Sequence, residues 1–204
     1  MFSSSILKRA NTTGTVEYRI INLRDFTQDK HRVTDDRPFG GGPGMVMKVE
    51  PIDLALRKIR SESPKACTHR VVLLSAQGEK YTQGKAREFA ALDMLTIICG
   101  HYEGVDERVA LHLADEEIRI GEYVLTGGEP AAAVIADSVV RLLPGVLGNS
   151  CSTHDESHDV PGQLGYPQYT RPAIYNGWEV PAVLLSGDHK LIMKWRRTQR
   201  KKDS

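Results

Sequence analysis

Residues 118–147 read IRIGEYVLTGGEPAAAVIADSVVRLLPGVL, and this stretch decides the fold of the chain. The pattern predicts a short strand that ends at Gly121, a bent loop with two further glycines, and an apolar helix from Pro130 to Pro144-Gly145. Glycines at a strand-to-helix turn let the backbone approach a ligand closely. An ordinary β–α connection would show the same pattern. This stretch alone therefore fits either a ligand-binding turn or a plain connection between strand and helix.

Two apolar segments before this stretch are predicted to be buried parallel strands, because both are short and rich in branched side chains. They are Val71–Leu74 and Leu95–Cys99, and a third strand is predicted at Glu117–Ile120. Helices are predicted between the strands, at Gln83–Leu92 and Val105–Leu113. Alternating strands and helices indicate the α/β class, with crossover connections and a parallel sheet.

Each predicted strand is followed by a loop of unusual composition. The loops are Ser75–Gly78, Gly100–Gly104 and Gly121–Gly128. Ligands of open α/β sheets bind outside the carboxyl ends of the strands, so three such loops at one edge predict a small-molecule site. The chain lacks the G-x-x-x-x-G-K-[ST] pattern and a G-x-G-x-x-G pattern after a strand, which argues against a P-loop and a dinucleotide fingerprint.

The length of 204 residues fits one domain, or one domain with a small appendage. Three widely spaced cysteines without a C-x-x-C pair favour the reducing cytoplasm and argue against a disulfide framework or a zinc ribbon. No apolar run approaches the ~20 residues that span a membrane. The N-terminus lacks a signal-peptide pattern, although Ser3–Ala10 could form a short helix. We therefore expect no membrane partner.

Charge is distributed unevenly along a chain whose net charge is only +1. Residues 99–137 hold nine acidic and two basic side chains, whereas residues 190–204 hold seven basic and one acidic. A basic segment beside a near-neutral body indicates a polyanionic partner, although a solvated terminus would look the same. Within it, His189–Arg200 is predicted to form an amphipathic helix.

Residues 149–165 show little apolar periodicity and are predicted to form a linker or a mobile loop. They contain two histidines four residues apart, His154 and His158, as in the helix of zinc proteases. That motif requires a glutamate where this chain has Asp155, and a firm helix that this polar segment does not favour. Three interpretations of this segment therefore remain: a solvated loop, a metal-hydrolase site, or a loop that supplies a general base.

Seven blocks of the chain carry distinctive glycine and tyrosine patterns, in a fixed order from about residue 20 to the C-terminus. They are DDRPFGGGPGM (35–45), LSAQG (74–78), CGHYEGVDER (99–108), IGEYVLTGGE (120–129), PGVLG (144–148), YTRP (169–172) and LLSGDH (184–189). Together these blocks resemble the bacterial tRNA (guanine-37-N1)-methyltransferases, a family of the SPOUT class.

The resemblance implies a SPOUT-type parallel sheet with helices on both faces and a C-terminal deep trefoil knot. True knots are rare in proteins, so this expectation comes from the resemblance alone. It implies a knotted cofactor-binding domain over residues 1–148, a flexible linker over 149–170, and the start of a helical tRNA-binding domain over 171–204. It also implies a homodimer that acts on tRNA.

Both ends of the chain depart from the family pattern. The family usually begins with a buried strand before a Phe-Pro-Glu-Met-Phe-like stretch, and Met1-Phe2 matches the end of that stretch. The family also continues well beyond Gln199 into its helical domain. We therefore expect a missing first strand, a truncated tRNA-binding domain and weak tRNA binding. A catalytically inactive RNA-binding or dimerisation remnant is the alternative to a working methyltransferase.

The resemblance implies S-adenosyl-L-methionine as the methyl donor, bound in a bent shape in the knot, and magnesium as a possible further requirement. Glu103 is expected near the sulfonium, where it could help to hold magnesium. The implied cofactor-binding positions are Leu73, Leu74, Ser75, Ala76, Gly78, Gly100, Tyr102, Glu103, Ile120, Gly121, Glu122, Tyr123, Val124, Leu125, Gly127 and Gly128.

Transfer to guanine N1 requires orientation, a carboxylate that accepts the N1 proton, and a cationic donor for the charge that develops on the ring. The resemblance implies Arg141 as the donor. It places the base on Glu156 by gap-free counting, or on Asp155 after a shift of one residue, and both remain candidates. Two departures, His101 for arginine and Ala76 for proline, lie where backbone contacts dominate, so we expect little effect from them.

Overall fold

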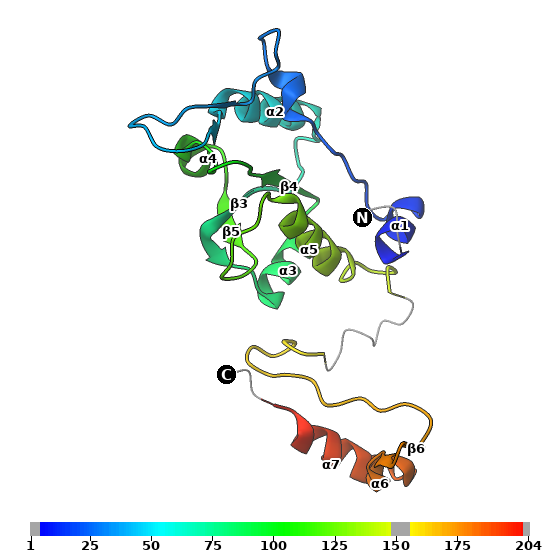
Figure 1. The fold of residues 1–204 in the computed structure, drawn as a ribbon. Helices are drawn as coiled ribbons and strands as arrows, with labels where there is room; N and C mark the ends of the chain where they lie inside the picture. The colour runs from blue at the N-terminus through cyan, green and yellow to red at the C-terminus, as the bar shows by residue number, and fades with distance from the viewer. Residues whose placement is uncertain (1–4, 148–155, 202–204) are drawn as a thin grey trace. The chain divides into compact units, whose positions relative to one another are not determined.

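The structure, a computed structural model, describes residues 5–147 and 156–201 of the chain (Figure 1). It divides into two compact units, Met1–Gly148 and Asn149–Ser204, each with its own internal packing. Within the described ranges, no helix combines the length and the apolar character that a membrane span requires.

A three-stranded parallel sheet with the order β4–β3–β5 forms the centre of the first unit. The central strand β3 (His69–Lys80) pairs with β4 (Met94–Cys99) on one side and with β5 (Glu116–Arg119) on the other. Residues 71–74 of β3 are all buried, as expected for a central strand that is covered on both faces. The predicted α/β class, the three strands and their parallel arrangement are confirmed.

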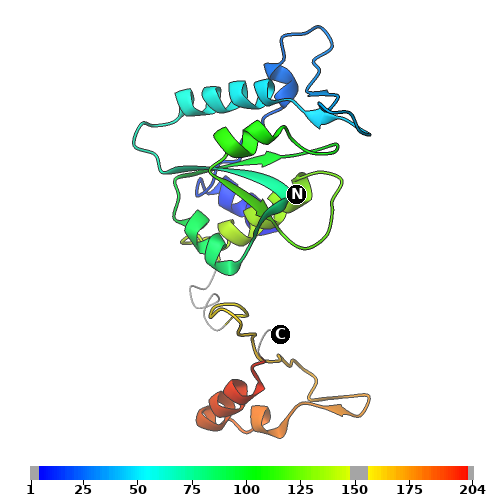
Figure 2. The same ribbon diagram turned by 90° about the vertical axis from the view of Figure 1, so that its left-hand side faces the viewer.

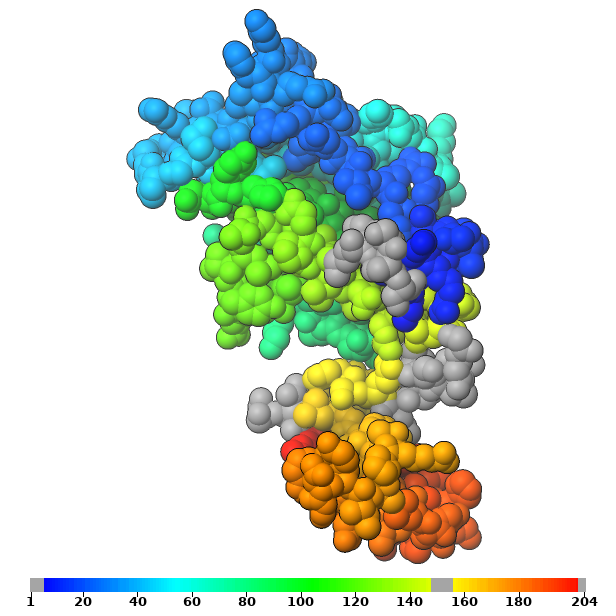
Figure 3. All heavy atoms as spheres, turned by 45° about the vertical axis from the view of Figure 1, so that its right-hand side comes forward, coloured from blue at the N-terminus to red at the C-terminus, as the bar shows by residue number. Residues whose placement is uncertain are grey.

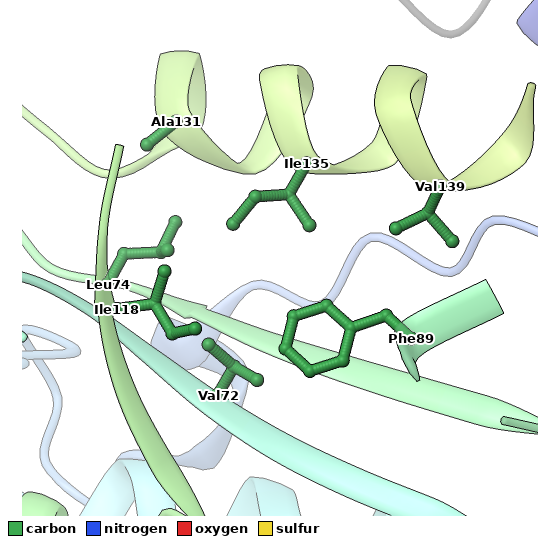
Figure 4. Close-up of a cluster of buried hydrophobic side chains, with 7 residues drawn as sticks. All are labelled: Val72, Leu74, Phe89, Ile118, Ala131, Ile135 and Val139. Carbon is green, nitrogen blue, oxygen red and sulfur yellow. The ribbon is translucent and has the colours of Figure 1, made fainter. Parts of the chain in front are cut away.

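One face of the sheet is covered by α3 (Gln83–Ala90) and α5 (Glu129–Val140). Residues four apart on α5 lie on one side of that helix and point at the sheet. Figure 4 shows the resulting cluster of buried side chains, which is formed by Val72, Leu74, Phe89, Ile118, Ala131, Ile135 and Val139.

The opposite face is covered by α2 (Val49–Glu62) and α4 (Glu107–His112), so helices lie on both sides of the sheet (Figure 2). Successive side chains of a strand point to opposite faces, and Val71 and Leu73 therefore face these two helices. The predicted two-sided cover is confirmed. The helix α2 is not among the predicted elements, although its buried residues recur at the spacing of an amphipathic helix.

The N-terminal helix α1 (Ser5–Thr12) packs against the end of α5 (Figure 3). Leu7 and Ala10 are buried against Val140 and Val146, and the guanidinium of Arg9 donates to the carbonyl of Val146. The predicted short helix is confirmed from residue 5 onward, and residues 3 and 4 lie outside the described ranges.

The helix α5 ends earlier than predicted, because the predicted apolar helix runs to Pro144 and α5 stops at Val140. Arg141 caps it, and the next two backbone N–H groups donate to carbonyls three residues before them, in a tightened last turn. A residue that precedes proline disfavours the helical region, and Gly145 adopts a positive φ of 77°. The chain therefore leaves the helix before the proline, although its apolar pattern continues.

The second unit contains a two-stranded hairpin and two helices. The strands β6 (Ile174–Tyr175) and β7 (Trp178–Glu179) are joined by a two-residue Asn-Gly turn with positive φ at both positions, as two-residue hairpins favour. The helices are α6 (Ala182–Leu185) and α7 (His189–Gln199). The carboxylate of Asp188 caps α7, and the predicted amphipathic helix at this position is confirmed.

Substitution of Ile135 by alanine tests the buried face of α5. This side chain is 0% exposed, so Ile135→Ala should lower the free energy of unfolding in urea by about 2–5 kcal/mol. Its neighbour Val134 is 46% exposed, and Val134→Ala should change the same quantity by only about 0.5 kcal/mol. Equal losses in the two variants would contradict the orientation of the helix.

Candidate functional site

The three loops that follow the parallel strands surround one cavity of about 280 Å³. Its walls come from residues 73–77, residues 100–105 and most of residues 117–128, with further contributions from α4 and α5. This volume lies near the lower end of the ~300–1,000 Å³ typical of small-molecule sites. The loops that the sequence pattern placed at the carboxyl ends of the strands thus lie around a common space.

All predicted cofactor positions except Gly78 and Glu122 line this cavity. Gly78 is buried beside β5, and Glu122 is exposed on its loop. Gln77, His101, Gly104 and Thr126, which belong to the three predicted loops, line it as well. The cavity also has walls outside the predicted loops and positions, namely Val105, Glu107, Ala110, Glu117, Ile118, Arg119 and Ala131. The α4 residues among them could have been anticipated, since α4 begins directly after the second loop.

The first loop, Ser75–Gly78, is a bulge within β3. The residues on either side of it both pair with Ile118 of β5, so the four residues between them leave the ladder. A Cβ atom on Gly78 would lie 2.3 Å from the backbone nitrogen of Ile118, and only glycine permits this approach. The guanidinium of Arg119 donates to the Gly78 carbonyl at 2.5 Å, which holds the bulge against β5.

The second and third loops meet through their glycines. The N–H of Gly128 donates to the carbonyl of Gly100 at 2.9 Å, and a Cβ on Gly128 would lie 2.7 Å from the Cα of Cys99. Burial, together with the nearby charge of Glu129, raises the pKa of the Cys99 thiol to about 11. This thiol therefore stays protonated at neutral pH, which argues against a role as a nucleophile.

A hairpin from the N-terminal part of the unit attaches to the second loop. Its strands are β1 (Asp35–Asp36) and β2 (Val46–Met47), on either side of the glycine-rich segment 37–45. The N–H of Glu103 donates to the carbonyl of Met45, and a Cβ on Gly44 would lie 2.4 Å from the Cγ of Glu103. The glycine-rich segment therefore ends at the rim of the cavity, beside Glu103.

A side-chain pair also joins the second loop to the first turn of α5. The Nε2 of His101 lies 2.6 Å from a carboxylate oxygen of Glu129. We expected backbone contacts to matter more than the side chain at His101; the structure adds a partner for its imidazole, and the small effect of this departure remains a prediction. The signal in the sequence is weak, because the two residues are 28 positions apart.

The predicted catalytic residues belong to different units. Arg141 is half-buried at the C-terminal cap of α5 in the first unit. Glu156 is half-buried at the start of the described part of the second unit, and Asp155 lies outside the described residues. The structure thus gives no geometry between Arg141 and either candidate base, and their roles remain predictions.

The zinc-protease interpretation of residues 154–158 gains no support. That motif requires both histidines on one helix. His154 lies outside the described residues, and residues 156–158 form a turn in which His158 has a positive φ of 64°. A residue in this left-handed conformation cannot continue a helix, so the described part of the motif lacks the geometry of a metalloprotease.

The second unit combines basic and aromatic side chains. The guanidinium of Arg196 lies 4.9 Å from the ring centroid of Tyr166, and the rings of Tyr175 and Trp178 lie 5.9 Å apart. Trp178 is 73% exposed. Exposed aromatic rings and basic side chains within one unit suit the bases and phosphates of a nucleic acid. The basic side chains of α7 and of the residues after it are Lys190, Lys194, Arg196, Arg197, Arg200 and Lys201.

Comparison with known proteins identifies the family. The family described as "tRNA (Guanine-1)-methyltransferase TrmD" matches residues 1–204. Relatives named "tRNA (guanine-N(1)-)-methyltransferase" include that of Geobacillus kaustophilus (strain HTA426), which is 54% identical over 199 residues, or 98% of this chain and 80% of that protein. The relative of Dehalococcoides mccartyi (strain CBDB1) is 51% identical over 198 residues, or 97% of this chain and 79% of that protein. The chain therefore belongs to the tRNA (guanine-1)-methyltransferase family.

Proposed function

We propose that the chain transfers a methyl group from S-adenosyl-L-methionine to N1 of guanine 37 in tRNA. The observation that carries this proposal is the family match over the whole chain, with relatives of that name at 51–54% identity. The cavity at the carboxyl ends of the parallel strands supports it, because it lies where the family resemblance implies the cofactor site. An enzyme that acts on tRNA works in the cytoplasm.

The walls of the cavity fit S-adenosyl-L-methionine. Gly100, Gly127 and Gly128 line the cavity and keep its loops close together, because a Cβ atom on any of them would meet neighbouring atoms within 3.0 Å. Leu73 and Ile120 supply apolar surface for a base and a ribose. When bound, the cofactor supplies a methyl group that its sulfonium already activates. The task of the chain is therefore to orient the two reactants.

Two groups of the chain would act on the guanine. A carboxylate in the linker, Glu156 or Asp155, would accept the N1 proton, which must leave as the methyl group arrives. The guanidinium of Arg141 would donate to the ring and stabilise the negative charge that develops there. The half-burial of Arg141 supports this role, because a partly desolvated cation interacts more strongly with a developing charge.

We assign no step to magnesium. Within residues 5–147 and 156–201, no three carboxylate, imidazole or thiol side chains gather into a group that could hold a metal ion. Magnesium in proteins keeps several waters and is bound through one or two carboxylates together with groups of the substrate, so we propose Glu103 as the residue of the cavity that would hold it.

We propose that the second unit binds the tRNA. Residues 149–170 would act as a flexible linker and residues 171–204 as the start of the RNA-binding domain, joined to a cofactor domain over residues 1–148. The basic side chains of α7 and the exposed Trp178 support this division of labour. Such binding would weaken steeply as salt rises, because phosphate contacts release counterions.

We further propose a homodimer. The loop between β5 and α5 exposes the apolar side chains of Tyr123, Val124 and Leu125, and α5 exposes Val134. Exposed apolar side chains suit an interaction surface, and a second copy of the chain would cover them in a symmetric interface. Gel filtration with light scattering would measure the mass in solution.

We also propose that the first unit carries the trefoil knot of its family. The close crossing of Gly78 beneath β5 and the contact of Gly128 with Cys99 support this proposal, because segments from distant parts of the chain pass one another without space between them.

The decisive experiment measures transfer of labelled methyl to two tRNA transcripts that differ only in guanine or adenine at position 37. We expect label in the guanine transcript alone, because adenine N1 carries no proton to be removed and lacks the neighbouring carbonyl. Label in neither transcript would favour the inactive RNA-binding remnant, and label in both would contradict the proposed position.

Amide substitutions test the proposed base. Asp155→Asn with Glu156→Gln should lower the rate of transfer by about 10²–10⁴-fold, since general-base catalysis contributes that much, while binding of S-adenosyl-L-homocysteine persists. The single variants identify which carboxylate acts. Glu50→Gln, an exposed acid of α2 outside the cavity and outside the proposed RNA-binding unit, serves as the matched control. Full turnover in the double variant would remove both residues from the mechanism.

Substitution of Gly128 tests the contact between the second and third loops. The Cβ of Gly128→Ala would push against Cys99, and a misplacement of about 1 Å costs roughly 100-fold in rate. We therefore expect about 100-fold slower transfer. In Gly84→Ala the new Cβ would meet only the Thr82 hydroxyl at 3.6 Å, and this variant should behave as the unaltered chain does. Equal rates in the two variants would contradict the proposed site.

A further inference from the structure

Two loops form facing walls of the cavity, and they are joined at two levels. Near the sheet, the N–H of Gly128 donates to the carbonyl of Gly100 at 2.9 Å. Toward solvent, His101 and Glu129 meet at 2.6 Å, with side chains that are 45% and 60% exposed. The inner bond belongs to the backbone, whereas the outer contact depends on side chains.

The outer contact passes over Gly127. A Cβ atom at this position would lie 2.6 Å from the Cε1 of His101 and 2.7 Å from a carboxylate oxygen of Glu129. A Cβ atom at this position would push the imidazole or the carboxylate aside, so glycine at position 127 lets the two groups meet here without displacement. Gly127 therefore lies against the side-chain pair, next to the residue that makes the backbone bond.

Neighbouring parts of the unit fix the backbone of each residue of the pair. The N–H of His101 donates to the Sδ of Met47 at 3.2 Å, and the N–H of Met47 donates to the carbonyl of Gly104 at 2.9 Å. The hairpin therefore fixes the backbone that carries the imidazole. Glu129 lies in the first turn of α5, a helix whose opposite end packs on α1.

We propose that His101 and Glu129 form a clasp across the rim of the cavity, which sets how fast the spent cofactor leaves. The inference rests on the proposed function, since it takes the occupant of the cavity to be S-adenosyl-L-methionine or its product. A ligand beneath the two loops leaves only when they separate, and separation breaks the clasp. His101 and Glu129 are thus positioning residues, which act on the loops and not on the reacting atoms.

The test measures the dissociation rate of S-adenosyl-L-homocysteine, by displacement with excess unlabelled ligand. His101→Leu and Glu129→Gln should each release it about twofold to fivefold faster, the range expected for an exposed ion pair. The double variant should be no faster than either single variant, because both remove the same contact. His101→Arg keeps a donor for Glu129 and should restore slow release.

A matched control separates the clasp from a general effect of surface charge. Arg57→Gln breaks an exposed ion pair of α2, in which the Arg57 Nε lies 2.8 Å from Asp53, and it should leave the dissociation rate unchanged. The Michaelis constant for the cofactor should rise in the clasp variants with little change in the rate at saturating cofactor. A purely structural defect would lower that rate as well.

Hydrogen exchange gives a reading that needs no ligand. The amides of residues 121–128, including the Gly128 N–H that bonds to Gly100, should exchange faster in His101→Leu and at the original rate in His101→Arg. Unchanged exchange and unchanged dissociation in His101→Leu would overturn the clasp alone. Failure of the unaltered chain to bind S-adenosyl-L-homocysteine would instead overturn the proposed function. Hydrogen exchange would still test the contact between the two loops in that case.

Discussion

Close approach between backbones is the constraint on which the rest of this structure depends. At Gly78 the chain passes within contact distance of the backbone of β5, and at Gly128 it passes within contact distance of Cys99. Neither crossing leaves room for a Cβ atom. Because these close approaches hold the three loops together, the cavity that the loops surround depends on glycine at both positions.

The helices that cover both faces of the sheet hold the strands in place at these close approaches of Gly78 and Gly128. Val72 and Leu74 of β3 hold α3 and α5 against one face, and α2 and α4 cover the other. The interior of the unit is apolar and closely packed, so the loops at the strand ends are attached to a rigid frame. A site on such a frame can hold a ligand without rearrangement of the core.

Much of the fold could be predicted, and the reasons differ from element to element. Branched runs identify β3, β4 and β5, and the pattern of apolar residues identifies α5 and α7. The bulge at Ser75–Gly78 could not be recognised as part of β3, because its residues read as a loop. The end of α5 was misplaced, because two leucines continue the apolar pattern after the helix has stopped.

The candidate site, like the fold, could be predicted only in part. Glycine-rich loops at strand ends point to the cavity from sequence, whereas the pairing of residues 101 and 129 depends on a distance that no local pattern encodes. Arg119 was overlooked because a charged residue at the end of a strand usually faces solvent, and here it bonds to a carbonyl of the neighbouring strand. The periodicity of a sequence carries no information about contacts between segments that are far apart in the chain.

The clearance above Gly127 has a consequence for how this site can change in evolution. A side chain at position 127 would displace the imidazole of His101 or the carboxylate of Glu129 from their present contact. Positions 101, 127 and 129 are therefore expected to covary, since a substitution at one alters which residues suit the other two. Sequence drift at this rim should favour paired replacements, with glycine at 127 retained most often where the pair is present.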